Sequence, residues 1–156
     1  MRVLENIIYD ELQVGDYATF TKTLTEEQLV LFAAASSDTN PQSLELENVK
    51  KELLNPDFGY GMWSESIITA AIDNVIPGPG TIYLEQQLKF EQKVDIGNTL
   101  TVKLTIKEKL ERHRVIIHCE VTNQDAELVV SGEAKVIAPT EKISIEQSEL
   151  PRIKIL

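Results

Sequence analysis

The segment SDTNPQS, residues 37–43, contains side chains that could hold and activate a water molecule. It places Asp38, Asn40, Pro41 and Ser43 directly behind the apolar run LVLFAAAS. A carboxylate can accept a proton and an amide can orient its partner, so these residue types suit general acid–base catalysis. Asp, Asn and Pro also form ordinary turns, and a serine hydroxyl is too weak a base to act unaided. The sequence therefore leaves open a working site, a degenerate site or a turn.

Histidine is the side chain most often used to carry a proton in such a site. The chain has two, His113 and His118. His118 alternates with apolar neighbours, which predicts that it faces outward, and we expect both histidines to lie on the surface. Glu45 is the other candidate partner, because two nearby carboxylates can act as acid and base when one pKa is raised. A solvated turn carboxylate is the simpler interpretation of Glu45.

Two helices are predicted on either side of this polar run. Thr25 can cap the first helix, with Gln28 three residues later completing a capping box, and we expect the helix to end near Ser36–Ser37. Residues 61–76, GMWSESIITAAIDNVI, are apolar around most of the helical circumference, which is typical of a buried helix. The PGPG motif at 77–80 ends it. We expect four of its side chains to be largely buried: Trp63, Ile67, Ala70 and Ala71.

Beyond the PGPG motif the apolar period changes from helical to two, which predicts four consecutive strands. A turn at Gly15–Asp16 begins an earlier strand, and 95–98 and 123–127 are predicted turns. Strands with one apolar face form an antiparallel sheet that must bury that face. The predicted fold class is therefore α+β, with one antiparallel sheet wrapped round helix 61–76. The alternating apolar sets are Ile82, Leu84, Leu88 and Phe90; Leu100, Val102, Leu104 and Ile106; Val115, Ile117, Cys119 and Val121; and Leu128, Val130, Ala134 and Val136.

Composition limits the classes of partner. A formal net charge of −10 argues against nucleic acid or an anionic membrane. No apolar run is long enough to span a bilayer, and acidic residues near the start argue against a signal peptide. The single cysteine, Cys119, fits a reducing compartment. We expect a cytoplasmic protein without metal or cofactor, with one domain over residues 1–138 and a linker or tail over 139–156.

Six short motifs occur along the chain in one order: VGD at 14–16, DTNP at 38–41, GM at 61–62, PGPG at 77–80, LKF at 88–90 and IGNTLTV at 96–102. With the predicted order of elements, they resemble the hotdog fold of the MaoC-like dehydratases, a family of (R)-specific enoyl-CoA hydratases. The resemblance covers roughly residues 8–138. It implies a single hotdog domain and a role in fatty acid metabolism. It also implies a homodimer, because free sheet edges invite pairing.

The resemblance also implies a reaction, the hydration of a trans-2-enoyl thioester. In the family, Asp and His of a D-x-N-P-x-H motif hold the water and Asn orients them. Asp38 matches the Asp and Asn40 the Asn, whereas Ser43 stands at the histidine position.

The family's H-G-M motif before the buried helix is YGM here, so Tyr60 replaces a second histidine. Backbone N–H groups at Gly61 and Met62 can still stabilise the enolate oxygen. The resemblance thus implies five substrate-binding residues: Tyr60, Gly61, Met62, Pro79 and Gly80.

The stretches GMWSESIITA, PGPGTIYLEQQLKF and VIAPTEKI resemble one branch in particular. In that branch the MaoC-like domain precedes a phosphate acetyltransferase or butyryltransferase, and residues 139–156 would lead into it. The missing histidine favours an acyl-CoA-binding and dimerisation domain with weak or no activity. Two alternatives remain: an active hydratase that uses Asp38 with a substitute partner, and an acyl-CoA thioesterase.

Overall fold

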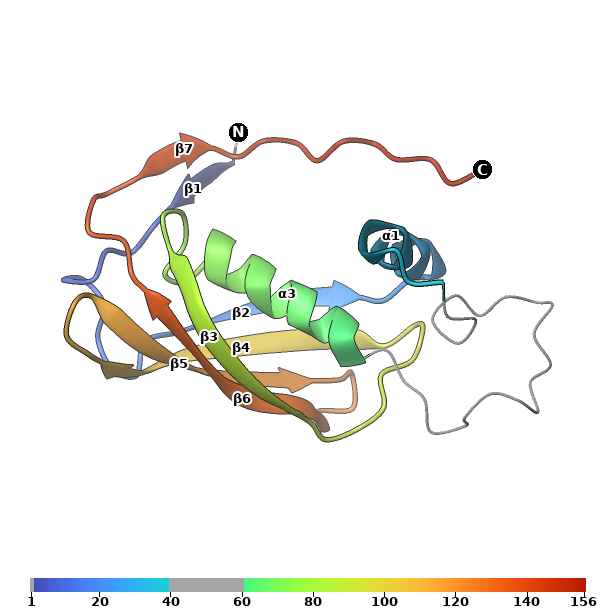
Figure 1. Ribbon diagram of the computed structural model, residues 1–156, viewed down its shortest axis with the longest axis horizontal. Helices are drawn as coiled ribbons and strands as arrows, with labels where there is room; N and C mark the ends of the chain where they lie inside the picture. The colour runs from blue at the N-terminus through green and yellow to red at the C-terminus, as the bar shows by residue number, and fades with distance from the viewer. Residues whose placement is uncertain (1, 40–60) are drawn as a thin grey trace.

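The computed structural model describes residues 2–39 and 61–156 and shows a curved five-stranded antiparallel sheet around one helix (Figure 1). The strand order is β2-β4-β5-β6-β3, and a separate two-stranded sheet joins β1 to β7. This confirms the predicted α+β class. The elements are β1 (Val3–Glu5), β2 (Tyr17–Thr23), α1 (Glu26–Ser36), α3 (Gly61–Asn74), β3 (Ile82–Phe90), β4 (Thr99–Lys109), β5 (Arg114–Thr122), β6 (Leu128–Ile137) and β7 (Ser144–Glu146).

Helix α1 begins at the predicted capping box. The Thr25 hydroxyl accepts the backbone N–H of Gln28 at 3.2 Å, and the Gln28 side chain accepts the N–H of Thr25 at 3.3 Å. The helix ends at Ser36, and Ser37 takes the left-handed conformation with φ 59°. Both predicted ends of this helix are therefore confirmed.

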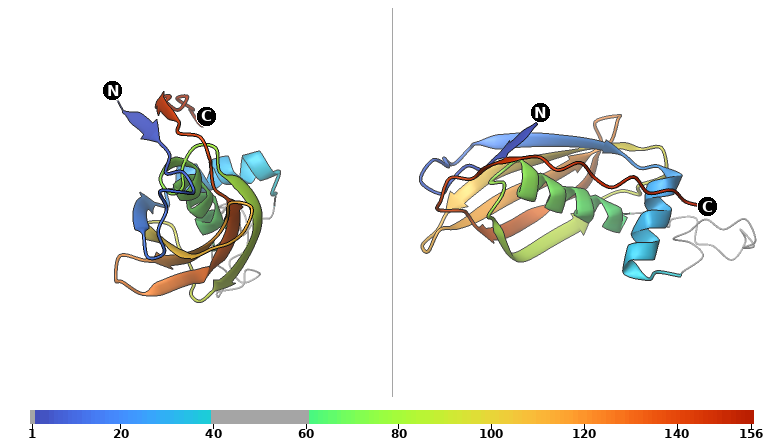
Figure 2. Two further views of the ribbon diagram at one scale, coloured as in Figure 1. Left: turned by 90° about the vertical axis from the view of Figure 1, so that its left-hand side faces the viewer. Right: turned by 90° about the horizontal axis from the view of Figure 1, so that it is seen from above.

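Helix α3 lies along the concave face of the sheet, where the inner side chains of β4 and β5 are fully buried (Figure 2). Trp63, Ile67 and Ala71 are almost completely buried, as expected. Burying each large apolar side chain contributes about 1.5–3 kcal/mol. Ala70 is only half-buried, because the sheet leaves one side of the helix uncovered. Ala70 belongs to the less buried stripe of the helix, which comprises Glu65, Ser66, Thr69, Ala70 and Asp73.

The predicted alternation in β3 is wrong for Ile82 and Leu84, because the strand contains a bulge. Tyr83 pairs with Val136, and the next pair is Glu85 with Lys135, so Leu84 is an extra residue. A bulge moves the following side chains to the opposite face. Ile82 and Leu84 are consequently 56% and 44% exposed rather than in the core. The inward-facing residues of β3 are Tyr83, Gln86, Leu88 and Phe90, by their pairing with the inner face of β6.

A second irregularity displaces the start of β6. The register shifts between Val121 and Thr122, and Thr122 pairs with Leu128. Leu128 is therefore 38% exposed, whereas the prediction placed it in the core, and Val129 and Val130 are fully buried instead. The apolar alternation predicted for β4 and β5 is confirmed throughout.

The segment after β6 folds back onto the N-terminus. Asn6 is 1% exposed and joins three chain segments. Its Nδ2 donates to the carbonyls of Pro79 at 3.0 Å and Glu141 at 2.9 Å, and its Oδ1 accepts the N–H of Ile143. Residues 139–146 therefore pack on the fold, which the prediction of a linker did not include. The predicted domain boundary at 138 itself stays a prediction. No helix among the described residues is long and apolar enough to cross a membrane.

Asn6→Ala should lower the free energy of unfolding by about 3 kcal/mol, because it leaves three buried polar groups without partners. Urea unfolding followed by circular dichroism measures this. The matched control is Asn74→Ala, at an exposed position at the end of α3, which should cost less than about 0.5 kcal/mol. Equal losses in the two variants would contradict the role assigned to Asn6.

Candidate active site

Asp38 lies in the turn that ends α1. Its N–H donates to the carbonyl of Ala33 at 2.9 Å, and the N–H of Ser37 donates to the carbonyl of Ala34 at 3.4 Å. A left-handed residue with such bonds is a common helix C-terminus. The Asp38 backbone is thereby fixed to the helix, and its side chain is exposed. Ser37 and Asp38 therefore form a turn that caps α1 and leaves the Asp38 carboxylate on the surface.

The remaining residues of the polar run lie outside the described residues. Their placement beside Asp38, including that of the alternative partner Glu45, stays a prediction. The residues concerned are Asn40, Pro41, Ser43, Glu45 and Tyr60.

The N-terminus of α3 is the second part of the candidate site. Figure 1 shows it at the same end of the domain as the C-terminus of α1. Gly61 contacts the ring of Phe90, so closely that a Cβ atom would lie 2.7 Å from Phe90 Cδ1. The Ser64 hydroxyl donates to the Gly61 carbonyl, and Met62 is 58% exposed. The first N–H groups of a helix have no intrahelical partner and favour negative charge. This end of α3 can therefore stabilise a developing oxyanion.

Pro79 and Gly80 lie beyond the other end of α3. A helix of 14 residues is about 20 Å long, so they are far from Gly61 of the same chain. Gly80 has φ +92°, and a Cβ atom at this position would lie 3.2 Å from Pro139 Cβ and 3.3 Å from Ile143 Cδ1. Their expected role in substrate binding stays a prediction.

Both histidines lie away from this end of the domain. His118 is on the outer face of the sheet, between the buried Ile117 and Cys119, and its Nε2 is 3.2 Å from Glu120 Oε1. His113 is exposed in the β4–β5 turn, where its ring contacts Tyr9. β4 is 11 residues long, so that turn is about 33 Å from the end of the sheet next to α1. The prediction that both are surface residues is confirmed.

Two buried polar atoms face α3 from the edge strand β3. Tyr83 Oη and Gln86 Nε2 have no hydrogen-bond partner in the part of the chain that the structure describes. Burial raises the pKa of Tyr83 well above its usual value, and the nearby carboxylate of Glu65 raises it further. The Thr69 hydroxyl already donates to Glu65 at 2.8 Å. The sequence did not reveal these atoms, because the bulge that turns them inward was not recognised.

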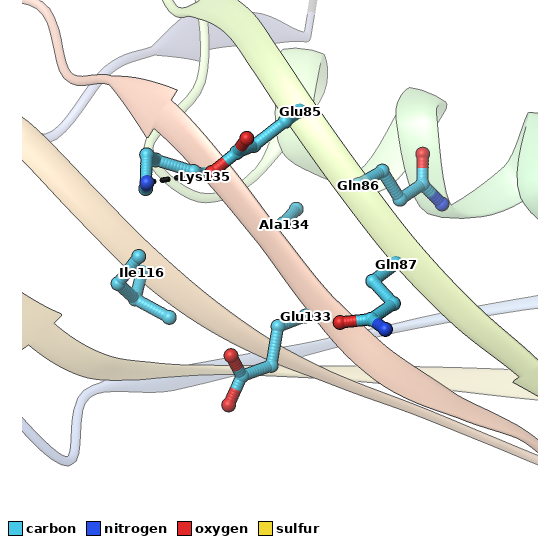
Figure 3. Close-up of a pocket in the computed structure, with 7 residues that line it drawn as sticks. All are labelled: Glu85, Gln86, Gln87, Ile116, Glu133, Ala134 and Lys135. Carbon is cyan, nitrogen blue, oxygen red and sulfur yellow. Dashed lines mark ion pairs between the residues drawn. The ribbon is translucent and has the colours of Figure 1, made fainter.

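A hollow of about 200 Å³ lies on the outer face of the sheet (Figure 3). Glu85 pairs with Lys135 at 2.5 Å, and Glu133 pairs with Lys107. Figure 3 shows Gln86 pointing away from this ion pair, toward the helix. The hollow is polar and on the far side of the sheet from α3, so it is separate from the candidate site. Its lining residues are Glu85, Gln86, Gln87, Ile116, Glu133, Ala134 and Lys135.

Comparisons with known proteins agree with this architecture. The model of the MaoC like domain matches residues 13–128. An (R)-specific enoyl-CoA hydratase from Rhodospirillum rubrum is 30% identical over 131 residues, covering 84% of this chain and 91% of its own. A 3-hydroxybutyryl-CoA dehydratase from Methylorubrum extorquens is also 30% identical, over 87% of each chain.

Solved structures give the same result. The unliganded R-hydratase PhaJ1 from Pseudomonas aeruginosa is 43% identical and has a TM-score of 0.89 over 99% of both chains. The (R)-hydratase from A. caviae is 30% identical, with a TM-score of 0.72 over 82% of this chain and 98% of its own. The sheet wrapped round α3 is the hotdog fold of these proteins. The family match covers most of the chain, and the chain therefore belongs to the MaoC-like family of hotdog dehydratases and hydratases.

Proposed function

We propose that this chain binds an acyl-CoA or enoyl-CoA thioester in a hydratase site that has lost its proton-carrying histidine. Hydration is then weak or absent. The observation that carries the proposal is the position of His113 and His118, which lie on the far hairpin and on the outer face of the sheet. Both therefore lie away from the end of the domain that holds Asp38 and the N-terminus of α3.

The part of the site that binds the thioester does not depend on that histidine. The oxyanion donors are backbone N–H groups at Gly61 and Met62, and the helix dipole supports them. The contact of Gly61 with the Phe90 ring holds this end of α3 against β3. Loss of the histidine therefore leaves the main electrostatic feature for thioester binding intact.

The hydration step, in contrast, depends strongly on the histidine. Asp38 can orient water or accept a proton, and its backbone is fixed by the end of α1. Hydration requires one group to accept a proton from water and a proton to be delivered to the α carbon. Without a second group of suitable pKa, Asp38 has no partner for these two proton transfers. One positioned acid–base group contributes typically about 10²–10⁴-fold in rate, and this is the deficit that we expect.

We infer a role as a binding and dimerisation domain that acts with a phosphate acyltransferase in the cytoplasm. The sequence resemblance to the fused branch supports the acyltransferase link. The free edge of β3 in the described sheet supports a homodimer.

An active hydratase that uses Asp38 with a substitute partner is the second candidate. The relatives named as hydratases, at 30% to 43% identity, favour it. No observation of this chain favours thioesterase activity.

Ser43→His should raise the rate of hydration of a short trans-2-enoyl-CoA by roughly 10²-fold or more, because imidazole supplies a base with a pKa near neutrality. Loss of the enoyl absorbance measures the rate. Asp38→Asn in the Ser43→His background is the control and should abolish the gain. A folded Ser43→His variant that binds acyl-CoA without any gain in rate would contradict the proposal.

Gly61→Ala should weaken binding of a saturated acyl-CoA about tenfold, because the new methyl group displaces either the Phe90 ring or the first turn of α3. Titration calorimetry measures the dissociation constant. Adding Phe90→Ala to Gly61→Ala should recover part of the loss, since it removes the obstructing ring. Unchanged affinity in the Gly61→Ala variant would show that the thioester does not bind at this helix end.

A further inference from the structure

Ser64 lies in the first turn of α3 and is completely buried. Among the described residues, Asn6 and Ser64 are the two polar side chains that the fold encloses almost entirely. The helix residues that surround Ser64 are apolar and also buried, namely Trp63, Ile67 and Ile68. A hydroxyl gains nothing from such surroundings unless it has a hydrogen-bond partner. The hydrogen bond is therefore what distinguishes Ser64 from an alanine at this position.

The partner of this hydroxyl is the first peptide unit of the helix. Ser64 Oγ donates to the carbonyl oxygen of Gly61. That carbonyl and the N–H of Met62 belong to one planar peptide unit, in which they point in opposite directions. At the start of a helix the N–H groups point out of the N-terminal end, where they have no intrahelical partner. Ser64 consequently holds the peptide unit whose N–H is one of the two proposed oxyanion donors.

A second contact restrains the same peptide unit from the edge strand β3. The Phe90 ring lies so close to Gly61 that a Cβ atom on the glycine would be 2.7 Å from Phe90 Cδ1. Glycine by itself is conformationally permissive, and helix ends fray. The ring of Phe90 and the hydroxyl of Ser64 therefore limit together the direction in which the Met62 N–H points.

The hydrogen bond to the Gly61 carbonyl also changes the strength of the Met62 N–H as a donor. Donation to the oxygen of a peptide unit polarises the unit, and linked hydrogen bonds strengthen one another by roughly 10–30% each. The helix dipole favours negative charge at the same place. Both effects act where the thioester oxygen gains charge in the proposed function.

Ser66 makes the same kind of bond to a different peptide unit. Its hydroxyl donates to the carbonyl of Trp63, also three residues earlier, at 2.5 Å. That peptide unit carries the N–H of Ser64, which is not one of the proposed donors. Bonding back to an earlier carbonyl is an ordinary way for a serine in a helix to find a partner. Ser66 is therefore a matched control for the bond of Ser64.

We propose that Ser64 is a positioning residue of the thioester site, whose hydroxyl orients and polarises the Met62 N–H that binds the thioester oxygen. This inference rests on the proposed function, because it takes the start of α3 as the place where that oxygen binds. Ser64 acts through the backbone and does not touch the ligand, since it is completely buried. The backbone donors of the site thereby depend on one particular side chain of the core.

Calorimetric titration with two ligands separates positioning from general stability. Butyryl-CoA has the thioester oxygen, whereas the thioether S-butyl-CoA lacks it. The wild-type protein should bind the thioester about tenfold more tightly than the thioether. Ser64→Ala should reduce this ratio about threefold, because it weakens thioester binding alone. Ser66→Ala should leave the ratio unchanged.

The contrary outcomes are distinct from one another. Equal loss of affinity for both ligands in Ser64→Ala, or an unchanged ratio, would overturn the role of Ser64 and leave the thioester site standing. A wild-type protein that does not distinguish the two ligands would show that no oxyanion donor is at work. That result would overturn the proposed thioester site and this inference together.

Infrared spectroscopy of bound butyryl-CoA, labelled with ¹³C at the thioester carbonyl, provides a measurement that does not depend on affinity. Oxyanion donors polarise this carbonyl and lower its stretching frequency on binding. The shift should be smaller in Ser64→Ala and unchanged in Ser66→Ala. Ser64→Cys, which keeps a side chain of similar size but has a weaker donor, should give an intermediate shift and serves if the alanine variant does not fold. A shift of wild-type size in a folded Ser64 variant would overturn the proposal.

Discussion

The packing of α3 on the concave face of the sheet is the contact on which the rest of this domain depends. Ile68 and Ile72 are completely buried there, between the helix and the inner side chains of the central strands. The sheet is curved, and the helix packs on its concave face. Because Gly61 begins this helix against the Phe90 ring, the same contact that forms the core also fixes the direction of the helix N-terminus. The position of the candidate thioester site is therefore a consequence of core packing.

This dependence explains how a site of this kind can lose chemistry without losing structure. Backbone donors at the start of α3 persist whatever side chain occupies position 43. A proton carrier, in contrast, is a single side chain, so one substitution is enough to remove it. Degeneration of the acid–base pair with retention of acyl-CoA binding is thus a physically accessible outcome for this fold.

The sequence predicted the parts of the fold that rest on uninterrupted periodicity and on local capping. The alternation in β4 and β5 and the Thr25–Gln28 capping box are examples. The prediction from sequence failed where a register shift changes which side chains of a strand face the core. A bulge leaves no signal in the pattern of apolar residues. Leu84 and Leu128 were placed in the core for this reason. The packing of residues 139–146 through Asn6 was missed as well, because one buried amide that joins distant segments has no local signature. For the candidate site, the motifs predict roles for Asp38 and Gly61 that stay predictions, whereas the unpartnered atoms of Tyr83 and Gln86 became visible only in three dimensions.

We propose that this MaoC-like domain binds the thioester but hydrates it poorly. The most direct measurement combines two quantities for the wild-type protein with one short trans-2-enoyl-CoA: the dissociation constant by calorimetry and the turnover rate from the loss of enoyl absorbance. We predict saturable binding together with a turnover rate lower by about 10²-fold or more than that of a hydratase with an intact Asp–His pair. A turnover rate within about tenfold of such an enzyme would contradict the account, because it would require an efficient acid–base partner other than histidine.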